Sequence, residues 1–435
     1  MRWSGGLTLV MWAALGMPLL AAGGPASRSE QLFGVRNASL HQVTELGVAW
    51  CSGPTVTWGA IEPRRGSYNW SRLDNLVRSA GQANVQLVPI IMCFSAWGSK
   101  PELVRANAAY HEARQSGLPR DVHAWMHFAS RLVERYDGDG RDDMTGLVQP
   151  VKHWQVEREL PRCWADGPAE LVKYLKLTEE AIKTADSSAQ VVVGGLAANA
   201  LYACAFADKA LPSLAVEGRA VDRASLVQST IYKQQRALVD ALLGPAAASF
   251  DVLDLHPYGC WECLPQVMGW VDDHPAVKGK PKWCLQGGAP VAMYDGTATE
   301  EEVAAGVVKW YCSLALLGVQ RAAWTVLPEP ETSESFNETA LIGTNGAQRS
   351  PWTAYTVLLE KVSGFTQVKR HAQPGLVAVE FARPSGLVVA VWASSTGMVD
   401  VSRFKIKRVT GLDGRMRPLP SKGKMELGPS PVFVE

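Results

Sequence analysis

The chain has 435 residues, of which 47% are hydrophobic and 20% charged, and 16 of them are tryptophan. This composition predicts one large domain with an ample core and a second, smaller one. The net charge of +1 gives no reason to expect binding to nucleic acid or to an anionic membrane.

The N-terminal segment has the pattern of a signal peptide. Arg2 is followed by an apolar run over residues 7–22, and small residues end the run at residues 23–26. Because the run is short and broken by glycine and proline, we expect a signal peptide over residues 1–26 and a secreted or periplasmic protein. The alternative is an uncleaved N-terminal anchor. No later stretch has the pattern of a membrane span.

The eight cysteines are scattered, and only Cys260 and Cys263 are closely spaced. An exported chain can form disulfides, but the sequence does not fix their pairing. A single Cys-x-x-Cys without a second pair is weak evidence for zinc, so we predict no structural metal.

Eight short apolar stretches are expected as β-strands. They cover residues 32–36, 46–51, 85–93, 153–159, 191–196, 250–258, 282–286 and 322–327. Helical spacing of apolar residues follows most of them, over residues 71–80, 121–135, 169–185, 225–243, 299–317 and 351–362.

This alternation of strands and helices predicts a parallel sheet, and eight units predict a closed (β/α)8 TIM barrel over residues 27–364. The alternative is an open doubly wound sheet. That fold would need a glycine-rich phosphate turn after the first strand, which residues 34–37 do not supply. After residue 364 the chain changes to short β segments between turns, which predicts a small antiparallel, β-sandwich-like domain over residues 365–435.

The fourth predicted strand ends in three charged residues, Glu157, Arg158 and Glu159. Alternation along a strand would place Glu157 and Glu159 on one face and Arg158 on the other. A solvated loop with a salt-bridged Arg158 is the ordinary alternative. In α/β barrels, however, the ends of the strands carry the active site.

Other polar and aromatic residues are expected at the same rim of the barrel. They are Trp50, Trp97, His256, Tyr258, Gln286 and Trp324. Each has an ordinary alternative: His256 as a satisfied core histidine, Tyr258 as loop packing, Trp324 as core filling. Their convergence on one rim favours a site, and tryptophan suits the apolar faces of sugar rings.

Several segments resemble the clan A retaining glycoside hydrolases, of the kind grouped as families 5, 39 and 42. The first segment runs from Trp58 to Asp74 and contains Ile61-Glu62-Pro63, Gly66, Tyr68, Trp70 and Leu73. Further segments are Arg135 to Gly140 leading into residues 151–156, His256-Pro257-Tyr258, and Lys280 to Trp283. The resemblance spans about residues 32–365 and does not fix a family within the clan.

The resemblance implies a role for two strand ends. In such enzymes a carboxylic acid protonates the leaving oxygen, and a carboxylate about 5–5.5 Å away attacks the sugar. The acid/base position falls on Glu159, and Arg158 stands where the family usually has a sugar-binding asparagine. The nucleophile position falls on Gln286, a neutral amide. The end of the second strand also lacks the arginine that often supports the nucleophile. Glu262 and Glu329 lie on loops that could reach the site.

Two functional hypotheses follow. The first is a glycoside hydrolase-fold enzyme that acts on a β-linked glycan, with Glu159 as acid/base and Gln286 at the nucleophile position. Arg158, Trp97, His256, Tyr258 and Trp324 would bind the substrate. The second is a catalytically silent carbohydrate-binding protein of the same fold, and a purely structural envelope protein is a third possibility. The expected partner is an oligo- or polysaccharide, and no cofactor is expected.

Overall fold

The computed structural model describes residues 32–107, 115–328 and 339–435. The predicted signal peptide and Glu329 therefore lie outside the described residues. Within those ranges no helix combines the length and the apolar character needed to cross a membrane.

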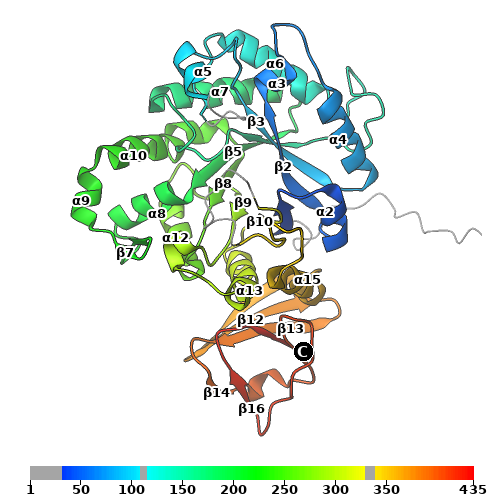
Figure 1. The fold of residues 1–435 in the computed structure, drawn as a ribbon, viewed down its shortest axis with the longest axis vertical. Helices are drawn as coiled ribbons and strands as arrows, with labels where there is room; N and C mark the ends of the chain where they lie inside the picture. Colours follow the sequence, from blue (N-terminus) through cyan, green and yellow to red (C-terminus); the bar gives the residue numbers. More distant parts are fainter. Residues whose placement is uncertain (1–31, 108–114, 329–338) are drawn as a thin grey trace, which may run out of the picture.

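Eight parallel strands close into a barrel (Figure 1), which confirms the predicted fold class. The strands are β1 (Phe33–Arg36), β2 (Trp50–Thr57), β3 (Gln86–Met92), β4 (His153–Val156), β5 (Gln190–Ala197), β8 (Val252–His256), β9 (Lys282–Gly287) and β10 (Arg321–Thr325). Their order around the barrel is β1-β10-β9-β8-β5-β4-β3-β2. The pairing of Val35 with Trp324 and of Val35 with Cys51 shows how β1 closes the ring between β10 and β2.

Helices surround the strands. The larger ones are α2 (Leu40–Leu46), α4 (Ser71–Gln82), α6 (Val122–Glu134), α7 (Pro168–Ala185), α8 (Ala198–Ala207), α10 (Thr230–Leu242), α11 (Leu264–Asp272), α13 (Glu300–Leu316) and α15 (Ser350–Val362). Their starts follow the sequence chemistry. Asp121 caps α6 by accepting from the Ala124 N–H, and Thr299 and Glu302 form a capping box on α13.

The second predicted strand was misplaced. Residues 40–46 form helix α2, and strand β2 begins at Trp50 and continues to Thr57. Ser39 and Gln42 form a capping box at the start of α2, and Gly47 ends it with φ 71°. The sequence signal for this helix was therefore present in the Ser-x-x-Gln spacing and the final glycine. The apolar run over residues 46–51 was instead interpreted as a strand.

The segment from Trp58 to Asp74, which carries much of the family resemblance, has a structural role. Glu62 is buried and accepts hydrogen bonds from the Trp58 indole (2.7 Å) and from the Gly66 N–H (2.6 Å). Asp74 accepts two bonds from Arg135, at 2.9 and 2.7 Å, and one from the Tyr136 hydroxyl at 2.8 Å. The Glu62 bonds hold the loop after β2 in its own conformation, and the Asp74 bonds join helix α4 to the two residues that follow helix α6. The motif therefore stabilises the fold.

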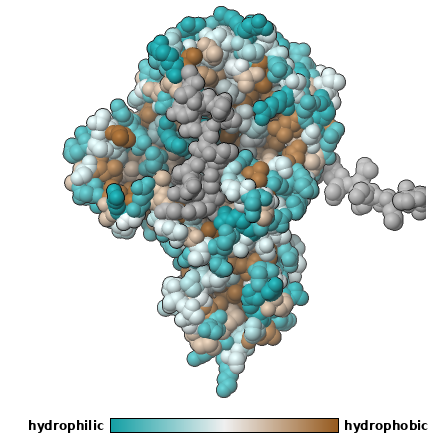
Figure 2. Space-filling model, viewed as in Figure 1, coloured by the Kyte–Doolittle hydropathy of each residue, from teal (hydrophilic) through white to brown (hydrophobic). Residues whose placement is uncertain are grey.

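The C-terminal part is an antiparallel β domain, as predicted. Its main sheet has the order β11-β12-β13-β17-β15, formed by β11 (Gln367–Gln373), β12 (Leu376–Arg383), β13 (Gly386–Ala393), β15 (Val409–Thr410) and β17 (Val432–Val434). A second ladder pairs β14 (Gly397–Asp400) with β16 (Lys424–Leu427). In Figure 1 this part lies below α13 and α15. Figure 2 shows hydrophilic residues spread over the visible faces of both parts, with apolar residues in scattered groups.

Candidate active site

Strand β4 ends at Val156, earlier than predicted, and the chain then turns sharply. Glu157 and Glu159 both adopt left-handed backbone conformations, with φ 66° and 47°. The expected alternation beyond Val156 is therefore wrong, and the two carboxylates have different surroundings. Glu157 is fully buried and accepts from the Cys93 N–H and from the Tyr174 hydroxyl, both at 2.9 Å. It is a structural carboxylate under helix α7, and burial raises its pKa.

Glu159 lies at the C-terminal mouth of the barrel, where it meets three side chains. Gln286, on β9, donates its Nε2 to Oε1 of Glu159 at 3.3 Å. His256, at the end of β8, places Nδ1 3.5 Å from the same oxygen. The guanidinium of Arg162 pairs with Oε2. The barrel thus brings together the predicted residues Glu159, Gln286 and His256.

A buried aspartate holds His256. The Nε2 atom of His256 is 3.0 Å from Oδ2 of Asp254, and Oδ1 of Asp254 accepts from the Leu285 N–H at 2.8 Å. Both side chains are almost completely buried. Strand β5 approaches closely: a Cβ on Gly195 would lie 1.9 Å from Nε2 of His256. Glycine at this position therefore makes room for the imidazole.

The charges of this chain of residues depend on one another. Burial raises the pKa of Glu159, but its ion pair with His256, together with Arg162 and Arg36, outweighs burial and lowers that pKa to about 2. Burial lowers the pKa of His256, but Asp254 and then Glu159 outweigh it and raise the pKa to about 9. At neutral pH the site therefore holds a carboxylate on Glu159 beside an imidazolium on His256.

Three residues of the site escaped the sequence reasoning: Asp254, Arg162 and Arg36. Asp254 could have been found, because it lies two residues before His256 and so shares its face of the strand. Arg36 lies at the end of β1, the strand next to β2, whose end lacks the expected arginine. The ion pair between Arg162 and Glu159 spans a turn after β4 and left no periodic signal in the sequence.

The other predicted sugar-binding residues occupy varied positions. Arg158 is half-buried, and within the described ranges it makes no ion pair, so the alternative of a salt-bridged Arg158 is not found there. Trp97 packs against Trp58, with 4.6 Å between the ring centroids, and donates its indole N–H to the Glu62 carbonyl at 2.7 Å. Trp324 is fully buried and donates to the Thr339 carbonyl at 2.8 Å. Their roles toward a sugar stay predictions.

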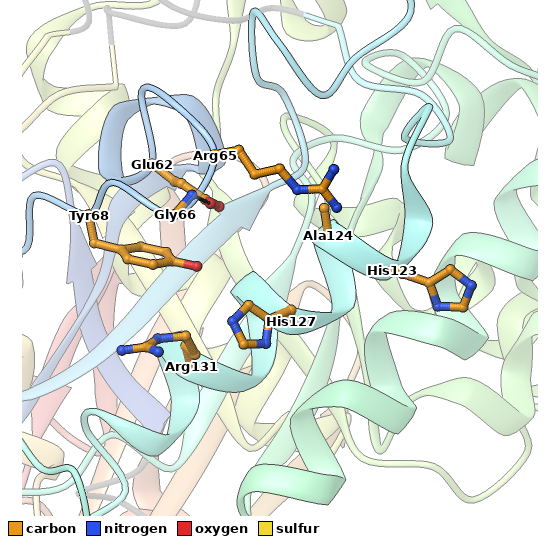
Figure 3. Close-up of a pocket in the computed structure, with 8 residues that line it drawn as sticks. All are labelled: Glu62, Arg65, Gly66, Tyr68, His123, Ala124, His127 and Arg131. Carbon is orange, nitrogen blue, oxygen red and sulfur yellow. Dashed lines mark hydrogen bonds between the residues drawn. The ribbon is translucent and has the colours of Figure 1, made fainter.

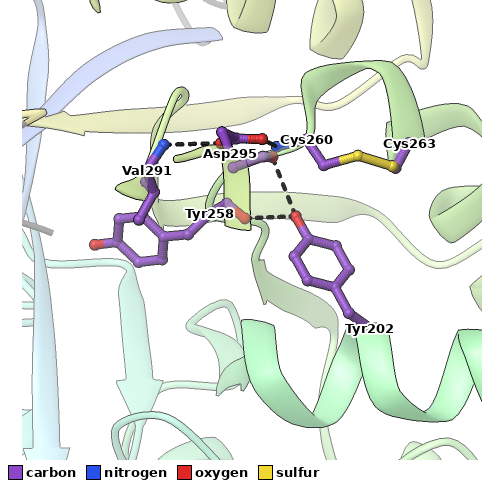
Figure 4. Close-up of a disulfide and its surroundings, with 7 residues drawn as sticks. Tyr202, Tyr258, Cys260, Cys263, Val291 and Asp295 are labelled. Atoms are coloured by element: carbon purple, nitrogen blue, oxygen red, sulfur yellow. Dashed lines mark hydrogen bonds between the residues drawn. A yellow bond between two sulfur atoms is a disulfide. The ribbon is translucent and has the colours of Figure 1, made fainter. Parts of the chain in front are cut away.

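Tyr258 lies on the turn after β8, which a disulfide braces (Figure 4). The Tyr202 hydroxyl donates to the Tyr258 carbonyl at 2.7 Å, and Cys260 forms a disulfide with Cys263. Asp295 accepts from the Cys260 N–H at 2.9 Å and from the Val291 N–H at 2.8 Å. The turn is therefore tied to α8 and to the loop after β9. Glu262 is exposed between the two cysteines.

A cavity of about 410 Å³ lies elsewhere, on the outer wall between the loop after β2 and helix α6 (Figure 3). Its lining includes Arg65, Tyr68, His127 and Arg131, and it contains none of the predicted site residues. Among the described residues, Glu134, Asp137 and Asp139 are the one group that could hold a metal ion. They lie at the C-terminal end of α6. Because the helices run against the strands, this is the opposite end of the barrel from Glu159.

No protein-family model matches the sequence, and no curated protein matches it. Solved structures do share its fold. A family 39 glycoside hydrolase from Bacteroides cellulosilyticus WH2 has 12% identity and a TM-score of 0.67, over 94% of this chain and 82% of that one. A monomeric β-xylosidase from Caulobacter crescentus CB15 has 13% identity and a TM-score of 0.57, over 95% and 97% of the two chains. A family 39 enzyme from Xanthomonas axonopodis pv. citri has 14% identity and a TM-score of 0.56, over 95% of each. The chain therefore has the fold of the clan A glycoside hydrolases, as the sequence resemblance implied.

Proposed function

We propose that this protein acts on a β-linked glycan at the mouth of its barrel, with Glu159 in the acid/base position and Gln286 in the nucleophile position. The observation that carries the proposal is the direct contact between these two side chains, which come from the ends of β4 and β9. Retaining glycosidases hold their two carboxyl groups about 5–5.5 Å apart, whereas inverting ones leave about 6.5–9.5 Å for a water molecule. Two groups in contact fit the retaining arrangement.

The chemistry of the pair limits the rate. In a retaining enzyme the second carboxylate attacks the anomeric carbon and then leaves as water arrives. An amide cannot form that glycosyl ester, and it places no negative charge beside an oxocarbenium-like transition state. We therefore expect ordinary β-glycosides to be hydrolysed slowly or not at all, while the glycan still binds.

A second candidate function is glycan binding without catalysis. The charge state of Glu159 favours it, because a group with a pKa of about 2 is ionised at neutral pH and cannot protonate a leaving oxygen as it stands. In a hydrolase the acid needs a raised pKa, and Gln286 supplies no negative charge to raise it.

A glycan array combined with a hydrolysis screen distinguishes the two functions. The mature protein should bind a subset of β-linked oligosaccharides. Restoring the carboxylate with Gln286→Glu should raise turnover of the bound class by at least about tenfold, which corresponds to about 1.4 kcal/mol of activation free energy. Gln234→Glu, on the exposed face of α10, is the matched control and should leave both properties unchanged.

Three outcomes decide the matter. Binding without any gain from Gln286→Glu would favour the silent binding protein. Fast hydrolysis by the unmodified chain that persists in Gln286→Ala would move the nucleophile to another residue. A protein that binds no glycan and hydrolyses none would refute the proposal.

The location of the protein is a separate proposal. The N-terminal pattern supports export to the periplasm or the medium, where an oligo- or polysaccharide would be the partner. N-terminal sequencing of the protein recovered from each fraction tests it, and an intact Met1 in a membrane fraction would instead support an anchor.

A further inference from the structure

One atom at the centre of the site has no partner. Gln286 donates Nε2 to Glu159, but its Oε1 is buried and accepts no hydrogen bond, and only 6% of the residue is exposed. A buried acceptor left unpaired destabilises the folded protein. The atom is closed to solvent in this structure, so a ligand that brings its own donor would satisfy it only as it displaces the side chains around Gln286.

The carboxylates near Glu159 are committed to other partners. Asp254 holds His256 and the Leu285 N–H, and Glu157 holds the Cys93 N–H and the Tyr174 hydroxyl. Within the described ranges, neither is placed to attack a sugar bound against the Glu159–Gln286 pair. With these two carboxylates committed, the ligand itself and water remain as sources of the attacking electron pair.

We propose that the sugar bound beside Gln286 is a β-linked 2-acetamido-2-deoxyhexose and that its acetamido oxygen takes the place of the missing nucleophile. This inference rests on the proposed function. The acetamido N–H would donate to Oε1 of Gln286, which orients the carbonyl oxygen toward C1. A 2-hydroxyl could also donate to Oε1, but it offers no oxygen that can form a five-membered ring at C1. Substrate assistance of this kind is known chemistry for glycosidases that lack an enzymic nucleophile.

The two steps balance without any oxidant or metal. In the first, the acetamido oxygen bonds to C1, the bond from C1 to the leaving oxygen breaks, and the leaving oxygen takes a proton from Glu159. Glu159 obtains that proton from the imidazolium of His256, whose Nδ1 is 3.5 Å away. The product is an oxazolinium ion whose N–H remains on Gln286. In the second step water bonds to C1, the ring oxygen of the oxazolinium leaves C1, and the proton of water returns through Glu159 to His256.

Matched aryl glycosides test the inference. The unmodified protein should hydrolyse 4-nitrophenyl N-acetyl-β-glucosaminide at least about 100-fold faster than the corresponding β-glucoside, because only the first carries the nucleophile. Replacing the acetyl group by trifluoroacetyl weakens the carbonyl as a nucleophile and should lower the rate at least about tenfold. Gln286→Leu keeps a similar volume without the acceptor and should lose about 10²–10³-fold of the N-acetyl activity. Gln234→Leu is the control.

A binding measurement covers the case of slow turnover. A thiazoline made from N-acetylglucosamine is a stable mimic of the bicyclic intermediate, and it should raise the melting temperature of the unmodified protein but not of folded Gln286→Leu. Equal rates on the two glycosides, no response to fluorination, or no thiazoline binding would overturn the inference. If other glycans still bind on the array, the proposed function survives that result. If none binds, both fail.

Discussion

At the scale of single residues, the site depends on how Asp254, His256 and Glu159 share charge. A fully buried aspartate would be costly without a partner, and His256 supplies one. The same imidazole then faces Glu159, so each group stabilises the ionised form of the next. The arrangement keeps His256 protonated and Glu159 ionised at neutral pH. Changes at any of the three positions should therefore be felt at the other two.

The space for His256 is the first point to test. Because a Cβ on Gly195 would lie 1.9 Å from the imidazole Nε2, Gly195→Ala should push His256 away from Asp254. We expect a loss of about 1–3 kcal/mol in the free energy of unfolding, together with weaker glycan binding. Gly269→Ala is the control, since no atom lies within 4 Å of its added Cβ and alanine favours a helix. Urea denaturation measures both, and equal stability of the two variants would contradict the crowding.

The raised pKa of His256 predicts how stability changes with pH. Its pKa is about 9 in the folded protein and about 6.5 when unfolded, so the folded state binds the extra proton. The stabilisation is complete below about pH 6.5 and is lost as the pH rises through 9, up to about 3 kcal/mol. Glu159, with its pKa lowered to about 2, contributes in the opposite direction. Its share is present above about pH 4.3 and is lost as the pH falls through 2.

Free energies of unfolding at pH 6 and pH 9 test this dependence. The unmodified protein should lose more stability across the interval than His256→Gln does. His127→Gln, on the exposed face of α6, should behave like the unmodified protein. Identical losses in all three proteins would show that His256 does not hold the proton.

At the scale of elements, the sequence predicted most of what local chemistry determines. Apolar runs and capping residues located seven of the eight strands and six of the larger helices, whereas α2, α8 and α11 were not predicted. The turn after Val156 could not be predicted, because left-handed conformations at Glu157 and Glu159 are imposed by their tertiary partners. Likewise the helix predicted over residues 225–243 is interrupted, because Ser229 ends a short helix and caps α10.

The hydrogen bonds of Asp74 allow a test of how two helices are joined. Asp74 joins helix α4 to Arg135 and Tyr136 through three hydrogen bonds, and its side chain is only 16% exposed. Asp74→Ala leaves a largely buried guanidinium and a hydroxyl without their acceptor, so the free energy of unfolding should fall by about 2–3 kcal/mol.

A surface pair provides the comparison for Asp74. Asp240 pairs with Arg236 four residues earlier on α10, and its side chain is 52% exposed. Asp240→Ala should cost only about 0.3–0.5 kcal/mol. Chemical denaturation of the two variants measures the difference. An Asp74→Ala protein as stable as Asp240→Ala would mean that the resemblance motif does not fasten the barrel.

At the scale of the whole molecule, the barrel rule placed the site, and its contacts lay beyond the sequence. Glu159 and Gln286 are 127 residues apart, and knowing that both lie at strand ends predicts a common rim. It does not predict which side chains touch. That depends on sub-ångström spacing between neighbouring strands, such as the close approach of Gly195 to His256.

The C-terminal sheet is a continuation of the barrel core. One face of the sheet, including Phe381, Trp392 and Phe433, belongs to the same buried cluster as the barrel helices, while the other face packs a separate small core. Trp392 meets Trp261 at 5.7 Å between ring centroids. Trp261 lies in the turn closed by the Cys260–Cys263 disulfide, which follows Tyr258. The β domain therefore supports the segment that carries one edge of the site.

Trp392 connects the β domain to the turn that follows β8. Trp392 is 3% exposed, and Trp392→Ala should cost about 3–5 kcal/mol in the free energy of unfolding, as for other large core truncations. The truncation leaves an empty space beside Trp261, in the turn that follows Tyr258. Glycan affinity should therefore also fall, although Trp392 lies on the C-terminal domain. Leu387→Ala, on the same strand with 56% exposure, should change stability by less than about 0.5 kcal/mol and leave affinity unchanged. Thermal unfolding and titration with a bound oligosaccharide measure the two effects. A Trp392→Ala protein that is destabilised but binds glycan normally would show that the β domain stabilises the barrel without supporting its site.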